Sequence, residues 1–192
     1  QLLRGFQEMK NKRWRGAFAV ALGLVRHQEA GPYLQRTLEE SSHAPLRGYC
    51  ALALGMMRYT PARESMNRVL QRSARQPDLL RQIAVGLGLL GDPSLVPTLL
   101  RMLEKGSDSL AYQAAVASGL GFVGDRTAIP PLVKMLFDRR LAELSRVFAA
   151  AALGTVADKE RLPWNSKIGF GLNYRASVET LTGSAKGVLD LL

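Results

Sequence analysis

The fold of this chain is decided by the stretch Leu120-Gly121-Phe122-Val123-Gly124-Asp125-Arg126. It follows an alanine-rich run and precedes Ala128-Ile129-Pro130-Pro131, so it predicts a helix that ends at a glycine, a short turn, and a second helix opened by proline. Its Leu-Gly pair recurs at a period of 32 or 33 residues, as Leu22-Gly23, Leu54-Gly55, Leu87-Gly88, Leu120-Gly121 and Leu153-Gly154. A fixed period of this size is typical of a solenoid of helix pairs.

Small residues precede each of these glycines. Four residues before it stands an alanine, and two before it an alanine or a glycine: Ala19, Ala51, Ala84, Ala117 and Ala150, then Ala21, Ala53, Gly86, Gly119 and Ala152. At helical spacing, such residues let two helix backbones approach closely. An apolar residue two positions after each glycine is expected to close the turn onto the core: Val25, Met57, Leu90, Val123 and Val156. A second leucine column, Leu38, Leu70, Leu103 and Leu136, supplies the apolar stripe of the other helix.

The turns carry a third periodic position, four residues after each glycine. The last three units place Asp92, Asp125 and Asp158 there, where a carboxylate can accept backbone N–H bonds and cap the next helix. His27 and Tyr59 occupy the position in the first two units, so we expect those turns to be stabilised differently. Ser107 and Asp108 are expected to cap the helix that begins near residue 109.

These signals predict ten helices, antiparallel within each unit because their connections are short. Their expected ranges are 2–9, 14–25, 32–40, 46–57, 62–73, 78–90, 94–104, 109–123, 129–137 and 142–156. The pattern changes after Asp158, and residues 162–192 are predicted to cap the end of the array. The expected domains are therefore 1–161, an array of about five helical pairs whose first member can be truncated, and 162–192, a capping segment.

The pattern Arg-x-x-Ala-x-x-x-Leu-Gly with a turn Asp and Ala-x-x-x-Leu, as in Arg146 to Asp158 and Ala128 to Leu132, resembles a HEAT repeat. It is most similar to the short bacterial HEAT-like type also found in phycobilisome lyase subunits, and the resemblance covers roughly residues 1 to 160. It implies an all-α fold, an armadillo-like α-solenoid of antiparallel helix pairs. It leaves the function open, because scaffolds, lyase subunits and a few nucleic-acid enzymes all use such arrays.

The formal net charge is +10, and its surplus lies in the amino-terminal half. Lysine and arginine number 14 against 6 acidic residues in 1–81, and 12 against 10 in 82–192. This asymmetry indicates an acidic partner, nucleic acid or an anionic surface, although a solvated helix face produces the same numbers. The chain begins at Gln1 rather than Met, which we interpret as processing or excision. A targeting segment can therefore be missing, and a cytoplasmic location is only the default expectation.

No catalytic or metal-binding constellation is apparent. The two histidines, His27 and His43, lie in different turns, and the single cysteine, Cys50, occupies an apolar column that predicts a buried structural thiol. The run from Gly86 to Gly91 matches the letters of a dinucleotide fingerprint but follows no strand, so helix packing and a helix C-cap explain it better. We therefore expect no enzymatic activity, no cofactor and no metal.

The first hypothesis for function is a scaffold or adaptor that binds a protein partner through the concave face of a right-handed array. In HEAT-like arrays the second helix of each pair lines that face, so the predicted binding residues are polar positions at the start of those helices, together with a tryptophan that stands between two arginines and could stack on a base or a partner side chain: Arg15, Arg47, Arg81, Gln113, Arg146 and Trp14. The arginines could equally hold neighbouring turns together, and for Trp14 packing at the end of the array is the default expectation. Nucleic-acid or polyanion binding through the basic amino-terminal half, and a role as a lyase-type accessory subunit, are the alternatives.

Overall fold

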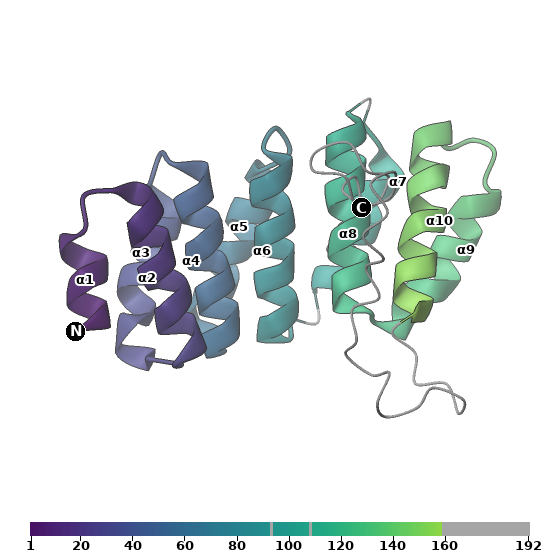
Figure 1. Cartoon of the computed structure of the whole chain (residues 1–192). Coiled ribbons are helices and arrows are strands. Elements are labelled where there is room, and N and C mark those ends of the chain that lie inside the picture. Colours follow the sequence, from purple (N-terminus) through teal and green to yellow (C-terminus); the bar gives the residue numbers. More distant parts are fainter. Residues whose placement is uncertain (93, 108, 159–192) are drawn as a thin grey trace, which may run out of the picture.

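The computed structural model describes residues 1–92, 94–107 and 109–158. Within them the chain forms ten α-helices and no strand (Figure 1). Their bounds are α1 (Leu2–Glu8), α2 (Lys12–Leu24), α3 (Gly31–Glu40), α4 (Ala44–Met57), α5 (Arg63–Arg72), α6 (Pro77–Leu90), α7 (Leu95–Lys105), α8 (Leu110–Val123), α9 (Ile129–Phe137) and α10 (Glu143–Asp158). Consecutive helices form five pairs, called units 1 to 5 below, so the predicted all-α solenoid is confirmed. Residues 162–192, predicted as the capping segment, lie outside the described residues.

The helix bounds agree with the prediction to within two residues at every end. The start of α4 is one correction, because the predicted break at 41–45 is shorter and the helix already begins at Ala44. Pro45 fits its first turn, and His43 caps it by accepting a hydrogen bond at Nδ1 from the Leu46 amide, 3.2 Å away. The cap of α8 is another correction. Ser109 rather than Ser107 accepts the Tyr112 amide, and Asp108 is not described.

The helices form two rows. Figure 1 shows the second helices of the units, α2, α4, α6, α8 and α10, side by side in front, with α3, α5, α7 and α9 behind them. Neighbouring second helices pack extensively on each other, whereas the first helices touch one another only thinly. The tight row is therefore the row of second helices. Its solvent-facing side is called the second-helix face below.

Close approach within this row depends on the repeated small residues. A Cβ atom added to Gly23 would lie 2.7 Å from the Cα of Ala53, and one added to Gly55 would collide with the backbone of Gly86. The small side chains before these glycines are mostly buried: Ala19, Ala51, Ala84 and Ala117. The last unit differs, since Ala150 is exposed and a Cβ on Gly154 would meet nothing within 4 Å. No following second helix covers α10 within the described part of the chain.

Each turn after a second helix contains a residue in the left-handed region, three positions after the repeated glycine. These residues are Arg26 (φ 52°), Arg58 (φ 54°), Gly91 (φ 76°) and Gly124 (φ 62°). In the first three turns, the next amide, from His27, Tyr59 or Asp92, donates to the carbonyl of the repeated leucine over 3.0 to 3.1 Å. The backbone of these turns is therefore the same, but their side chains differ as expected, because neither the His27 nor the Tyr59 side chain makes a capping hydrogen bond to a described residue. The difference is confined to the side chain at that position.

The two described turn aspartates accept backbone amides as predicted. Asp125 caps the short 3-10 helix Arg126–Ala128 that leads into α9, whereas Ser94 is the N-cap residue of α7 and Asp92 bonds to the Ser94 amide. The Asp92 Oδ1 accepts the Ser94 amide at 2.9 Å, and the Asp125 Oδ1 accepts the Thr127 amide at 2.8 Å. Burial opposes ionisation of Asp92, but hydrogen bonds from Ser94 and Asn67 prevail and hold its pKa below the usual value. The side chain of Asp158 lies outside the described residues. Val25 is a further correction, because it is exposed instead of closing its turn onto the core.

Candidate binding surfaces

Two predicted binding residues, Arg47 and Arg146, make equivalent bonds inside their own units. The Nε of Arg47 donates to the carbonyl oxygen of Leu38 over 2.8 Å, and the Nε of Arg146 donates to that of Leu136 over 3.2 Å. Both carbonyls belong to the last turn of a first helix, where the helix itself offers no donor. Burial lowers the pKa of Arg47. These guanidinium groups therefore tie the two helices of a unit together.

Arg15 and Gln113 occupy the same column and also bond within the array. The Arg15 guanidinium lies over the Phe6 ring, 4.7 Å from its centroid, and so joins α2 to α1. Gln113 is fully buried and donates from Nε2 to the Ser145 hydroxyl of the next unit, 3.1 Å away. Its Oε1 has no hydrogen-bond partner among the described residues. Four of the predicted residues thus lie at helix-to-helix contacts.

Arg81 and Trp14 are placed differently. Arg81 lies one position beyond the arginine column and is exposed, with its Nη2 3.5 Å from the Asp78 carboxylate. Trp14 is 62 % exposed, so the interpretation as a packing residue at the end of the array is wrong. The six predicted residues therefore do not converge on one site. Trp14 and Arg81 alone among them are exposed.

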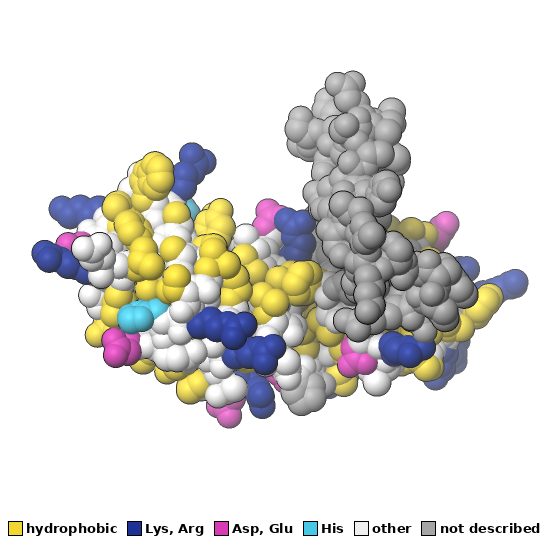
Figure 2. All heavy atoms as spheres, turned by 60° about the horizontal axis from the view of Figure 1, so that its bottom comes forward, with side chains coloured by type: hydrophobic (Ala, Val, Ile, Leu, Met, Phe, Trp, Pro, Cys, Tyr) yellow, Lys and Arg dark blue, Asp and Glu magenta, His cyan; other side chains and the backbone are white. Residues whose placement is uncertain are grey.

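An apolar strip crosses the second-helix face. Its residues stand three positions before or one position after the repeated glycine: Val20, Leu24, Leu52, Met56, Val85, Leu89 and Phe122. Leu24 is 69 % exposed and Phe122 41 % exposed, whereas Val20, Leu52, Met56 and Val85 are partly buried. Figure 2 shows hydrophobic side chains gathered over the amino-terminal half of the array. The predicted binding residues did not include this strip, because they were selected among polar positions. The sequence does contain a signal for it, since an apolar residue recurs directly after the repeated glycine at Leu24, Met56, Leu89 and Phe122.

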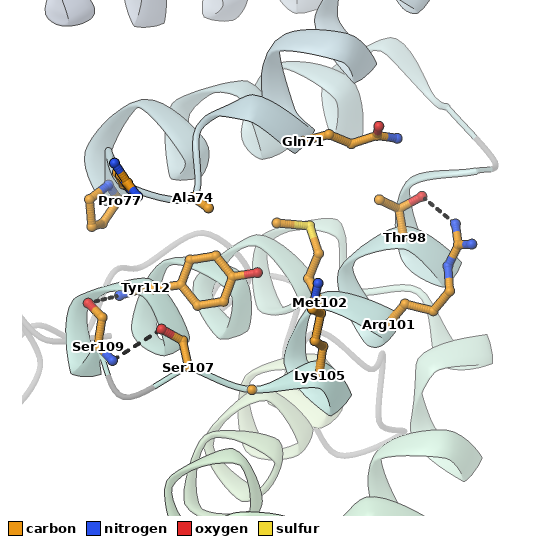
Figure 3. Close-up of a pocket in the computed structure, with 12 residues that line it drawn as sticks. Gln71, Ala74, Pro77, Thr98, Arg101, Met102, Lys105, Ser107, Ser109 and Tyr112 are labelled. Carbon is orange, nitrogen blue, oxygen red and sulfur yellow. Dashed lines mark hydrogen bonds between the residues drawn. The ribbon is translucent and has the colours of Figure 1, made fainter.

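A pocket of about 850 Å³ opens between units 3 and 4 (Figure 3). Its walls come from the end of α5, the start of α6, one side of α7 and the start of α8. It forms because α5 and α7 of the first-helix row scarcely touch, while α6 and α8 of the second-helix row stay packed on each other. Three cationic side chains line it, those of Arg75, Arg101 and Lys105, and every described charged residue of the lining is cationic.

Reactive chemistry is not apparent in the described residues. They contain no cluster of histidine, cysteine and carboxylate side chains that could hold a metal ion. Cys50 is fully buried, and burial raises its thiol pKa to about 12, which confirms the structural interpretation of this residue. The run from Gly86 to Gly91 lies in α6 and its left-handed C-cap, as predicted. None of the helices among the described residues is long and apolar enough to cross a bilayer.

Comparison with known proteins agrees with this architecture. No curated protein matches the chain. A family model described as HEAT repeats matches residues 66–153, from the middle of α5 into α10. HEAT repeats generally mediate protein interactions, and the family is typically non-catalytic. The region from the middle of α5 into α10 therefore consists of HEAT repeats, and units 1 and 2 continue it with the same arrangement of helix pairs.

Proposed function

We propose that this chain is a non-enzymatic module that binds a protein partner on its second-helix face, as a scaffold or adaptor. The observation that carries the proposal is the apolar strip, which runs from Val20 on α2 to Phe122 on α8. Single exposed apolar side chains are normal on a protein surface, but a continuous line of them marks an interaction site. Stacked repeats present such a line as one extended concave surface.

The bonds of the arginine column support this assignment. Arg47 and Arg146 already use their Nε atoms on carbonyls of their own units, and Arg15 lies on Phe6. A partner that recruited these groups would have to break contacts that hold helix pairs together. We therefore assign partner contact to the strip, with the exposed side chains of Trp14 and Arg81 as additional polar or aromatic contacts.

Nucleic-acid binding through the basic amino-terminal half has weaker support. Several of its arginines are engaged by carboxylates, since Arg4 pairs with Glu8, Arg36 with Glu40 and Arg68 with Glu39. Two exposed aromatic residues of this half stand near cations and could stack on a base, Trp14 beside Arg13 and Tyr33 in a pocket that is also lined by Arg36. The experiment below separates this alternative from protein binding.

A partner search that compares Phe122→Glu with Phe137→Glu tests the proposal. Both replace an exposed phenylalanine, but Phe137, which is 75 % exposed, lies at the end of α9 in the first-helix row. Proteins cross-linked to the chain in cells of its source are identified by mass spectrometry for each variant. We expect Phe122→Glu to lose a protein that the native chain and Phe137→Glu both retain.

Equal retention by both variants would overturn the proposal. Nuclease treatment before recovery adds a second readout, because a complex that disappears after digestion points to nucleic acid instead. Circular dichroism of each variant verifies that the helical array is intact.

A further inference from the structure

We propose that the pocket between units 3 and 4 binds an acidic peptide segment of the partner, one that carries carboxylates beside an apolar side chain. The proposal rests on the proposed function, because it assigns a chemistry to part of the same partner. It concerns a different surface from the apolar strip, so the two can fail separately.

The first observation is a periodic charge pattern on the first helices. Two positions, 13 and 17 residues after the repeated glycine, lie one helical turn apart. They hold Arg36 and Glu40 on α3, Arg68 and Arg72 on α5, Arg101 and Lys105 on α7, and Lys134 and Asp138 on α9. In unit 2 the pair is neutralised, with 2.9 Å between the Arg36 Nε and a Glu40 carboxylate oxygen. In units 3 and 4 a second cation, Arg72 or Lys105, replaces the carboxylate, although Arg68 of unit 3 pairs with Glu39 of unit 2.

The second observation is that these two units flank the pocket. Arg101 and Lys105 line it from α7, and Arg75 lines it from the turn after α5. Among the described residues Arg101 makes only long hydrogen bonds, with its Nε 3.4 Å from the Pro97 carbonyl oxygen and its Nη2 3.4 Å from the Thr98 hydroxyl. The equivalent pocket between units 1 and 2 is lined by the carboxylates of Glu8 and Glu40 as well as by cations. Asp108, between two serines of the lining, is not described.

The third observation concerns Tyr112, which lies at the bottom of the pocket. Tyr112 is only 8 % exposed and stands where units 2 and 3 have the buried leucines Leu46 and Leu79. Figure 3 shows its hydroxyl oxygen directed toward Met102. Burial raises the pKa of Tyr112, so the neutral phenol can donate a hydrogen bond at physiological pH. The pocket thus combines hydrogen-bond donors and an apolar wall with cations at its edge.

These features favour a peptide over nucleic acid. The pocket volume of about 850 Å³ is within the range of ligand pockets, so the pocket can hold a few side chains of a bound peptide. Proteins that bind single-stranded nucleic acid without sequence preference stack the bases on exposed aromatic rings. Tyr112 is too buried to offer such a ring face. Arginine and lysine side chains bind carboxylates through charge-assisted hydrogen bonds, which are the stronger kind.

Fluorescence anisotropy with two labelled peptides tests the inference. One is a short peptide in which leucine is flanked by glutamates, and the other has glutamine in place of each glutamate. We expect only the first to bind the full chain at physiological salt. Arg101→Gln combined with Lys105→Gln is expected to weaken it about tenfold or more. Arg13→Gln combined with Arg139→Gln removes the same charge from exposed positions outside the pocket and is the matched control.

Equal weakening by both double variants, or equal binding of both peptides, would overturn the inference. So would preferential binding of a single-stranded oligonucleotide that Arg101→Gln with Lys105→Gln abolishes. Phe122→Glu separates this inference from the proposed function, because it is expected to lose the partner but keep the affinity for the acidic peptide. If peptide binding fails while the effect of Phe122→Glu on the partner persists, only the pocket assignment falls.

Discussion

The Nε of Arg47 lies 2.8 Å from the carbonyl oxygen of Leu38, and this bond joins the start of α4 to the end of α3. The same relationship recurs between Arg146 and Leu136 in unit 5. An arginine at this position therefore supplies a donor to a helix C-terminus that lacks one.

Arg47→Ala should reduce the free energy of unfolding by about 1 to 2 kcal/mol, because it removes a charge-assisted donor from a partly buried carbonyl. Arg81→Ala is the matched control, since Arg81 is exposed and should change stability by less than about 0.5 kcal/mol. Urea unfolding followed by circular dichroism measures both. If the two variants shift the midpoint equally, Arg47 does not fasten the helix pair.

Arg58→Gly should stabilise the chain by about 1 kcal/mol. Arg58 has a φ of 54°, a conformation that is unfavourable for residues with a Cβ atom, and glycine occupies the equivalent turn position at Gly91 and Gly124. Arg58→Ala is the control, because alanine keeps the Cβ and should bring no such gain. Thermal or urea unfolding compares the two variants. A glycine variant no more stable than the alanine variant would contradict the strain argument.

The same substitution should have opposite effects in two units. Gly55→Ala places a Cβ against the backbone of Gly86, which cannot move aside as a flexible side chain can, and should destabilise the array by about 2 kcal/mol. Gly154→Ala meets no atom of the described residues within 4 Å, and in a chain that ends at residue 161 and so lacks the predicted cap it should stabilise α10 by about 0.5 to 1 kcal/mol through helix propensity. Unfolding midpoints measure both. Changes of the same sign would show that these two glycines are not in the surroundings described.

Stability should fall with rising pH above about pH 9 because of Cys50. Burial raises its thiol pKa from 9.0 to about 12, and Arg15 opposes this only in part. Between these values the unfolded chain releases the proton and the folded chain keeps it, so the stabilising contribution is present below pH 9 and is lost toward pH 12.

Between pH 8 and pH 10, the free energy of unfolding should fall by about 1 kcal/mol more for the native chain than for Cys50→Ala. Urea unfolding of both proteins at the two pH values measures the difference, and all other titrating groups cancel. Parallel pH dependence of the two chains would refute the prediction.

Residues 162–192 are predicted to cap the array, and α10 shows what such a cap would cover. Val147, Ala150 and Gly154 are exposed on α10, whereas the equivalent Ala114, Ala117 and Gly121 are buried under the next unit. A chain that ends at residue 161 should therefore unfold at a lower temperature than the full chain. Calorimetry measures the melting temperatures of both chains. Leu24→Glu in the full chain is the control, because it changes an exposed apolar residue at the other end of the array. An unchanged melting temperature would argue against a cap.

The repeat, its helices and its turns could be predicted from the sequence because each unit of a solenoid contacts only its neighbours. The Leu-Gly pair, which recurs in all five units, and the turn aspartates of the later units, such as Asp92 and Asp125, are local signals. Local chemistry repeated at a fixed spacing was therefore sufficient for the fold class and for most helix ends.

The candidate sites depend on distances between helices, which the pattern does not contain. The arginine column gave no indication of whether Arg47 faces a partner or the carbonyl of Leu38, because a long side chain reaches either from the same position. Likewise, α5 and α7 separate while α6 and α8 stay packed, and that separation exposes Arg101 and Lys105 to a common pocket. The sequence by itself determined which residues repeat. Only the packing of neighbouring helices, which differs from unit to unit, decided which of the repeated residues are buried, which bond within a unit and which face solvent.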